Sequence, residues 1–215
     1  TAKFISTKLA MRFVSDHPAP SLVDRMAQTF LKKDGDIREV LKTMFHSPEF
    51  WAPESYRAKV KTPLEFVVSA VRSSGAEVSD ALPLARQLQD MGMQLYGMQP
   101  PTGYSMEAQA WLNSSALLGR MNFALALTAG KLKGVLVDFD RIFGAGFGPG
   151  NSPGDPPAAL AALENSLLAG DVSQQTHDTI AAQGVEAKPS DSKSGPLGMR
   201  VMAGLLLGSP EFQRR

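Results

Sequence analysis

Residues 114–129 read SSALLGRMNFALALTA, and this long, strongly apolar stretch sets the expectation for the fold class. We expect one long helix over it, with Arg120 and Asn122 as polar side chains within an apolar surface. Arg120 interrupts the apolar run from Ala116 to Gly130, and no apolar run in the chain reaches the roughly 20 residues that a membrane span requires. We therefore predict a helix over this stretch, and we expect no membrane span in this chain.

Helical spacing of apolar residues continues on both sides of this stretch. Near the start of the chain, Phe4, Ile5, Leu9 and Phe13 are spaced to share roughly one face of a helix over about 2–14. Caps, first-turn prolines and terminal glycines predict further helices at about 21–34, 36–46, 62–74, 80–91, 105–111, 158–169, 173–183 and 197–208. Residues 134–139 could form one short strand. The pattern predicts an all-α protein, a multi-helix, bundle-like array with short loops.

The composition changes sharply after residue 143. Residues 144–157 contain five Gly and four Pro, which is typical of a loop or linker. We therefore expect a main helical core over 1–143, a Gly/Pro-rich linker over 144–157, and a tail of shorter helices over 158–215 that packs on the core. The whole would form one domain.

Two segments of the chain resemble each other. Val40 to Phe50 and Val201 to Phe212 are both apolar helical segments that end in Ser-Pro-Glu-Phe, and Ser209 follows Ser47 by 162 residues. In such a corner the Ser caps a new helix, the Pro takes its first position and the Glu lies near the positive end of the helix dipole. Two interpretations remain open: convergent use of a good helix-to-helix corner, or an old duplication.

The charge and cysteine content exclude several functional classes. The chain has 22 Lys and Arg against 21 Asp and Glu, a net charge of +1, and no Cys. There is no reason to expect a nucleic-acid partner or an anionic membrane. The lack of Cys excludes disulfides, thiolate metal sites and a Cys nucleophile. Basic residues concentrate in Lys32-Lys33 and in residues 57–61, which we interpret as solvated faces.

The histidines and carboxylates give no catalytic or metal-binding pattern. The three histidines, His17, His46 and His177, have none of the spacings of a local zinc site, so we predict no metal and no cofactor. His46 is most simply explained as a group that compensates the dipole or caps the chain at a helix C-terminus. Asp36 and Glu49 are placed to stabilise helix N-termini. No phosphate-binding or dinucleotide-binding glycine loop is present.

The best candidate for a ligand site lies between Tyr104 and Asn122. If one helix were continuous through this region, Trp111 and Asn122 would share a face. A buried Arg120 must be paired or strongly hydrogen-bonded. It would then lock the helix to a carbonyl or carboxylate elsewhere, or serve as an anion clamp beside a stacking wall of Tyr104 and Trp111. These four residues are the candidate ligand-binding set, and the catalytic residues are unknown.

With these residues in view, the sequence resembles the C-terminal half of an uncharacterised bacterial family, domain of unknown function 1800. The matching stretches follow in order along the chain: residues 1–9, 12–16, 35–38, 47–51, 61–67, Arg72, 111–112, 119–124 and 209–214. The polar members of these stretches, all candidates, are Arg12, Asp16, Lys61, Glu65, Arg72, Trp111, Arg120 and Asn122. Residues 144–196 depart most from the family pattern.

The resemblance implies that this chain is a fragment of a longer, exported protein of the bacterial periplasm or cell surface, although the chain itself shows no signal peptide. It also implies two partners: the missing N-terminal half of the same protein, and another exported protein. The family has no established activity, so no catalytic residue is carried over. We expect a structural or interaction module. The alternative is a hydrolase or carbohydrate-active domain with a site near residues 104–122, and whether the protein is an enzyme stays open.

Overall fold

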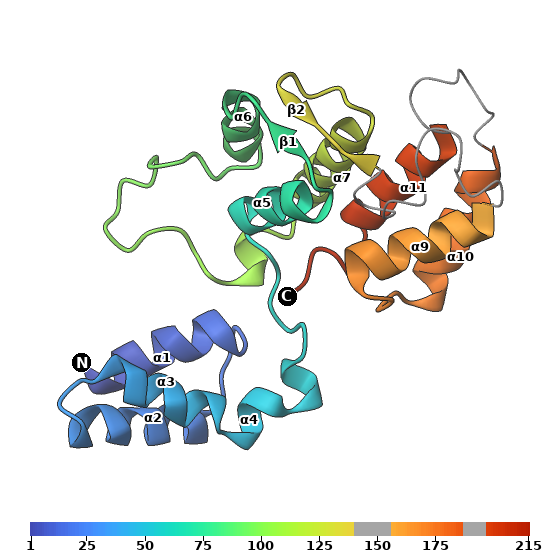
Figure 1. Ribbon diagram of the computed structural model, residues 1–215. Helices are drawn as coiled ribbons and strands as arrows, with labels where there is room; N and C mark the ends of the chain where they lie inside the picture. Colours follow the sequence, from blue (N-terminus) through green and yellow to red (C-terminus); the bar gives the residue numbers. More distant parts are fainter. Residues whose placement is uncertain (140–155, 187–196) are drawn as a thin grey trace. The chain divides into compact units, whose positions relative to one another are not determined.

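The computed structural model describes residues 1–139, 156–186 and 197–215, and these residues are mostly helical (Figure 1). They form two compact units, each described here by itself. Unit 1 comprises Thr1–Thr62, Tyr104–Leu112 and Arg214–Arg215, and unit 2 comprises Pro63–Gly103 and Asn113–Gln213. The all-α prediction is confirmed. The predicted linker falls mostly outside the described residues.

Unit 1 is built on three helices that contact one another. These are α1 (Ala2–Phe13), α2 (Pro20–Lys32) and α3 (Ile37–Phe45), followed by the short α4 (Pro48–Trp51) and the 3-10 turn η1 (Pro53–Ser55). Asp36 caps α3 as predicted, because its carboxylate accepts N–H bonds from Arg38 at 2.9 Å and Glu39 at 3.4 Å. The core of the unit consists of Ala10, Val14, Leu22, Val23, Met26, Val40 and Met44.

Two later segments of the chain complete unit 1. Residues 104–112 contain the 3-10 turn η2 (Ala108–Ala110), where a short helix over 105–111 was predicted. The last residues return to residues 59–60: Val60 and Arg214 form an isolated β-bridge, and the Arg215 N–H donates to the Lys59 carbonyl at 2.9 Å.

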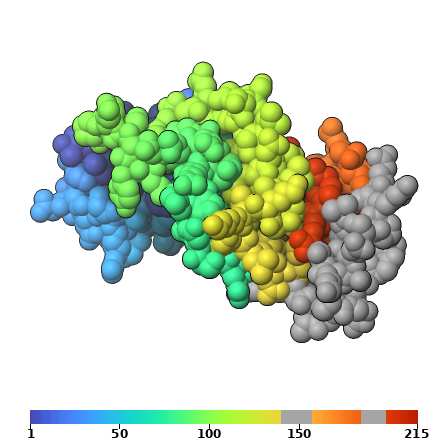
Figure 2. Space-filling model, turned by 90° about the horizontal axis from the view of Figure 1, so that it is seen from above, coloured from blue at the N-terminus to red at the C-terminus, as the bar shows by residue number. Residues whose placement is uncertain are grey.

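In unit 2 the helix predicted over 114–129 packs on the last helix of the chain. This helix, α7 (Ser114–Thr128), lies against α11 (Leu197–Gly208), and α11 also contacts α9 (Pro156–Leu168) and α10 (Gln174–Glu186). Gly204 and Gly208 permit the close approach, because a Cβ at either position would meet α7 atoms within 2.7 Å. Part of the surface around α7 is seen in yellow-green in Figure 2.

The remaining elements of unit 2 are α5 (Pro63–Ser73), α6 (Leu82–Asp90) and a small sheet. The strand expected within 134–139 is shorter, β2 (Val135–Leu136), and it pairs antiparallel with β1 (Glu77–Val78). β1 was not predicted, since two exposed residues carry no periodicity. The last two prolines of the predicted linker begin α9, where their fixed φ suits the first turn of a helix.

Candidate functional site

Two of the four candidate ligand residues, Tyr104 and Trp111, lie in unit 1 and contact each other. Their ring centroids are 6.0 Å apart with the planes tilted by 54°. The Trp111 side chain is 6% exposed, and its indole N–H donates to the Ser105 carbonyl at 3.0 Å. The indole is therefore buried with its N–H hydrogen-bonded. This bond joins the two ends of the segment 104–112.

Trp111 is not part of α7, contrary to the shared-face interpretation. Asn113 has an extended backbone, with φ −127° and ψ 162°, and its side chain accepts the Ala116 N–H at 2.8 Å. This is an N-cap, so α7 begins at Ser114 and the helical register does not extend back to Trp111. The continuous helix on which that interpretation depended is absent.

Arg120 lies in unit 2 and is completely buried, at 0% exposure. Its guanidinium donates to the side-chain oxygen of Gln213 at 3.3 Å and lies 5.3 Å from the centre of the Phe66 ring. Burial lowers the pKa of Arg120 from its ordinary value, because desolvation disfavours the charged form. The contact with Gln213 ties α7 to the end of the chain segment that follows α11, which is a structural role.

Asn122 is the one candidate whose residue is exposed to solvent. It is exposed on α7 and lines a hollow of about 390 Å³, together with Lys131 and Arg200. Arg200 already donates to the Thr128 carbonyl at 3.4 Å and lies 5.1 Å from the centre of the Phe139 ring. The four candidates therefore divide into a pair in unit 1, a buried arginine in unit 2 and an exposed asparagine in unit 2.

A buried ion pair in unit 1 joins three segments of the chain. The Lys59 ammonium, 3% exposed, donates to the Asp16 carboxylate and to the Met106 carbonyl at 2.7 Å. The second oxygen of Asp16 accepts the Ala108 N–H at 2.7 Å. Burial opposes the ionisation of Asp16, but these bonds and the Lys59 charge outweigh it, so the pKa of Asp16 is lowered. The solvated-face prediction for residues 57–61 is wrong for Lys59, because the partners that bury it lie 43 and 47 residues away.

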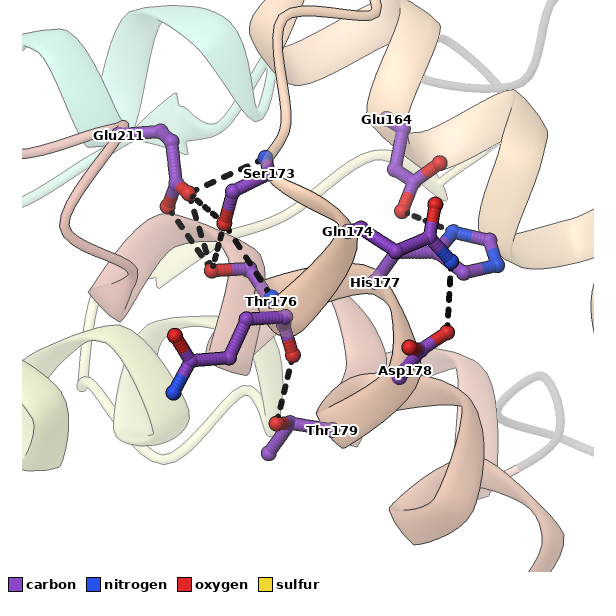
Figure 3. Close-up of polar contacts among 9 residues, drawn as sticks. Glu164, Ser173, Gln174, Thr176, His177, Asp178, Thr179 and Glu211 are labelled. Carbon is purple, nitrogen blue, oxygen red and sulfur yellow. Dashed lines mark hydrogen bonds and ion pairs between the residues drawn. The ribbon is translucent and has the colours of Figure 1, made fainter.

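The second Ser-Pro-Glu-Phe corner is fastened to the start of α10 (Figure 3). Glu211 accepts the Ser173 hydroxyl at 2.6 Å, the Ser173 N–H at 3.2 Å and the Thr176 hydroxyl at 3.0 Å. Burial opposes ionisation of Glu211, yet the hydroxyl bonds hold its pKa below the ordinary value. A carboxylate beside a helix N-terminus is further stabilised by the helix dipole. This cluster clamps two segments together.

A second polar contact joins α9 and α10 in the same region (Figure 3). The His177 ring nitrogen Nδ1 lies 2.8 Å from the Glu164 carboxylate. Within the part of the chain that the structure describes, no group of three His, Asp or Glu residues could hold a metal ion.

The first corner uses its glutamate in the same way. Glu49 accepts the Ser21 hydroxyl at 3.0 Å and the Arg25 guanidinium at 2.5 Å, both from α2. The hydrogen bond from Arg25 holds the pKa of Glu49 below its ordinary value. His46, which precedes this corner, places Nδ1 2.8 Å from the Lys42 carbonyl, at the C-terminal end of α3, as expected from its position.

Four aromatic rings beside this corner form a continuous series, which we call the aromatic ladder: Phe13, Phe45, Phe50 and Trp51. Neighbouring centroids are 5.9, 5.1 and 5.3 Å apart, all edge-to-face. Trp51 is 75% exposed, while its indole N–H donates to the Phe45 carbonyl at 2.7 Å. Phe13 and Phe45 are also exposed. The ladder is thus an apolar surface of which three rings, Phe13, Phe45 and Trp51, are exposed to solvent.

Nearly the whole chain matches a family model. Residues 1–214 match the model described as "Protein of unknown function (DUF1800)". The chain belongs to this family. No curated protein matches the chain, and no solved structure matches it.

In this DUF1800 chain each structural clamp has one partner in the stretches that carry the family resemblance. Asp16, Ser47, Glu49 and Glu211 all lie within them. Sequence reasoning missed Lys59 and Ser173, because their partners are distant in sequence. It also missed the aromatic ladder, in which only Phe13 is distant in sequence from the other rings. The one local signal was the repeated corner itself. Across the described residues, no helix has the length and apolar character needed to cross a membrane.

Proposed function

We propose that this chain is a structural or interaction module that binds another polypeptide. The observation that carries the proposal is the aromatic ladder of unit 1. Large apolar side chains exposed together mark protein interaction sites more often than single exposed residues do. Trp is enriched among the residues that dominate binding energy at protein interfaces.

The ladder suits binding because its side chains are already held in place. The edge-to-face contacts and the bond from the Trp51 indole to the Phe45 carbonyl fix the rings before any partner arrives. Binding then costs little side-chain entropy, which is the advantage of a preorganised surface.

The alternative expected from the sequence, a hydrolase or carbohydrate-active domain near residues 104–122, has less support. It needs Trp111 and Arg120 to reach a ligand, and both side chains are buried among partners of their own unit. We therefore propose the interaction module alone.

The proposal includes a place and two kinds of partner, both supported by the family resemblance. The place is the bacterial periplasm or cell surface. The partners are the N-terminal half found in longer relatives and another exported protein.

The test is recovery of a stoichiometric partner. The tagged chain is expressed in the organism that encodes it, cross-linked in intact cells, and fractionated into cytoplasm and envelope. We expect an envelope location and one partner that re-forms a complex when both purified proteins are mixed. A chain that stays in the cytoplasm contradicts the location, and a chain that yields no re-forming complex contradicts the function.

A further inference from the structure

The two Ser-Pro-Glu-Phe corners have the same hydrogen-bond geometry. The Ser47 N–H donates to the Met44 carbonyl at 3.0 Å, and the Ser209 N–H donates to the Leu206 carbonyl at 3.1 Å. Each serine hydroxyl accepts the N–H of its phenylalanine, Phe50 or Phe212, at 3.3 Å. The resemblance in sequence is therefore a resemblance in structure.

The helices before each corner also correspond. α1, α2 and α3 contact one another in unit 1, and α9, α10 and α11 contact one another in unit 2. In each set the corner glutamate accepts a serine hydroxyl from the start of the middle helix, Ser21 for Glu49 and Ser173 for Glu211. The two sets of three helices therefore share these contacts, and we call them the first and the second copy. Their correspondence favours duplication as the origin of the repeated segment.

In the second copy, one face of the last helix is covered by another helix. Gly204, Leu207 and Gly208 are spaced to share a face of α11, and Gln213 follows the corner. A Cβ on Gly204 or Gly208 would meet α7, and Gln213 accepts from Arg120 of α7 at 3.3 Å. Leu207 is fully buried. The covering helix presents Met121, Leu125 and Thr128, an apolar stripe with one hydroxyl.

In the first copy, the corresponding face is open. A shift of 162 residues places Lys42 at Gly204, Phe45 at Leu207, His46 at Gly208 and Trp51 at Gln213. All four residues of the first copy are exposed. Trp51 donates to the helix-end carbonyl of Phe45, much as Gln213 donates to that of Gly208 at 2.8 Å. The position taken by α7 in the second copy has no counterpart among the described residues of unit 1.

We propose that this open face, formed by Lys42, Phe45, His46 and Trp51, docks an α-helix of a partner protein. The inference rests on the proposed interaction function and names its surface and partner class. The partner helix carries an aliphatic stripe, as α7 does for the second copy. Carboxylates flank that stripe, because the basic residues of unit 1 outnumber the acidic ones and Lys42, whose ammonium also contacts Glu39 at 2.6 Å, takes the place of a glycine on this face.

The test uses the whole chain and a synthetic model helix of about five turns. The helix carries leucines and alanines on one face and glutamates beside them, with a fluorescent label for anisotropy. One comparison peptide scrambles the same residues so that no apolar face forms, and another replaces the glutamates by lysines. We expect saturable binding of the first peptide, weaker binding of the lysine peptide and none of the scrambled peptide.

Substitutions in the proposed face test whether the model helix binds there. Trp51→Ala weakens binding about tenfold or more, the effect of losing a buried aromatic anchor. Lys42→Glu, an exposed substitution that leaves the core untouched, reverses the preference between the glutamate and lysine peptides. Leu31→Ala is the matched control, since Leu31 is an exposed aliphatic residue of α2 outside this face, and it leaves binding unchanged. The indole N–H signal of Trp51 in an NMR spectrum shifts on binding.

Several results would overturn the proposal. The first is equal binding of the scrambled peptide, and the second is unchanged binding after Trp51→Ala in a variant whose fold is intact by circular dichroism. The third is adsorption of the chain to phosphatidylglycerol vesicles without binding of the model helix. The fourth is self-association of the chain that is lost on Trp51→Ala. The proposed interaction function is tested separately from this docking face. A cellular partner that binds equally well to Trp51→Ala and Lys42→Glu refutes this face and leaves the function standing, whereas recovery of no partner refutes the function.

Discussion

Replacing Glu211 by Gln isolates the clamp between the second corner and α10. The carboxylate accepts three donors from Ser173 and Thr176, the closest at 2.6 Å. Gln keeps the shape and one acceptor oxygen, but it loses the charge that strengthens these bonds and the attraction to the N-terminus of α10. A charge-assisted bond contributes about 1.5–3 kcal/mol and the dipole about 0.3–1 kcal/mol. Because one oxygen and some solvent access remain, we expect a loss of about 2 kcal/mol from the free energy of unfolding.

The pH dependence provides a second measurement of the same clamp. The pKa of Glu211 is lowered in the folded chain, so its stabilising contribution is complete above the unfolded value of about 4.3. That contribution disappears as the pH falls through the lowered folded value. Glu211→Gln therefore costs more stability at pH 7 than at pH 3. Urea unfolding followed by circular dichroism at both pH values measures this.

A double-mutant cycle with Ser173→Ala separates the clamp from general damage. We expect a coupling energy of about 1 kcal/mol or more between the two positions, because the two side chains contact each other directly. Glu77→Gln, an exposed position on β1, is the control and changes stability by less than about 0.5 kcal/mol. Additive single effects, or an equal loss at pH 3 and pH 7, would refute the reasoning.

Three further substitutions test other parts of the structure by urea unfolding. Lys59→Met leaves the Asp16 carboxylate without its buried ammonium and should lower the free energy of unfolding by about 3 kcal/mol. Adding Asp16→Asn should restore part of that loss, and no restoration would contradict the ion-pair explanation. Gly204→Ala forces a Cβ to within 2.7 Å of Thr128 and should cost about 1–3 kcal/mol; an unchanged stability would contradict the close packing of α7 on α11. Gly119→Ala is its matched control, because the nearest atom to the new Cβ is 4.0 Å away; it should stabilise α7 by up to about 1 kcal/mol, and a loss would show hidden crowding.

The functional residues divide according to whether their partners are local. The predictions for Asp36 and His46 concerned bonds to their own helix ends, and both bonds are present. The expectation that a buried Arg120 locks its helix agrees with its bond to Gln213, although the partner, 93 residues away, was not foreseeable. The prediction that Trp111 shares a face of α7 was wrong, because the Asn113 cap makes the helix begin at Ser114, three residues after Trp111.

The sequence alone determined the helical character of the chain, the position of most helix ends and the repeated corner, because periodicity and capping act within a few residues. Only the tertiary structure decided which side chains became buried partners. It paired Lys59 with Asp16, joined Glu211 to Ser173, and covered Gly204 with α7 while leaving Phe45 and Trp51 open. Such pairings depend on how helices distant in sequence pack against each other, and that packing is a property of the whole fold.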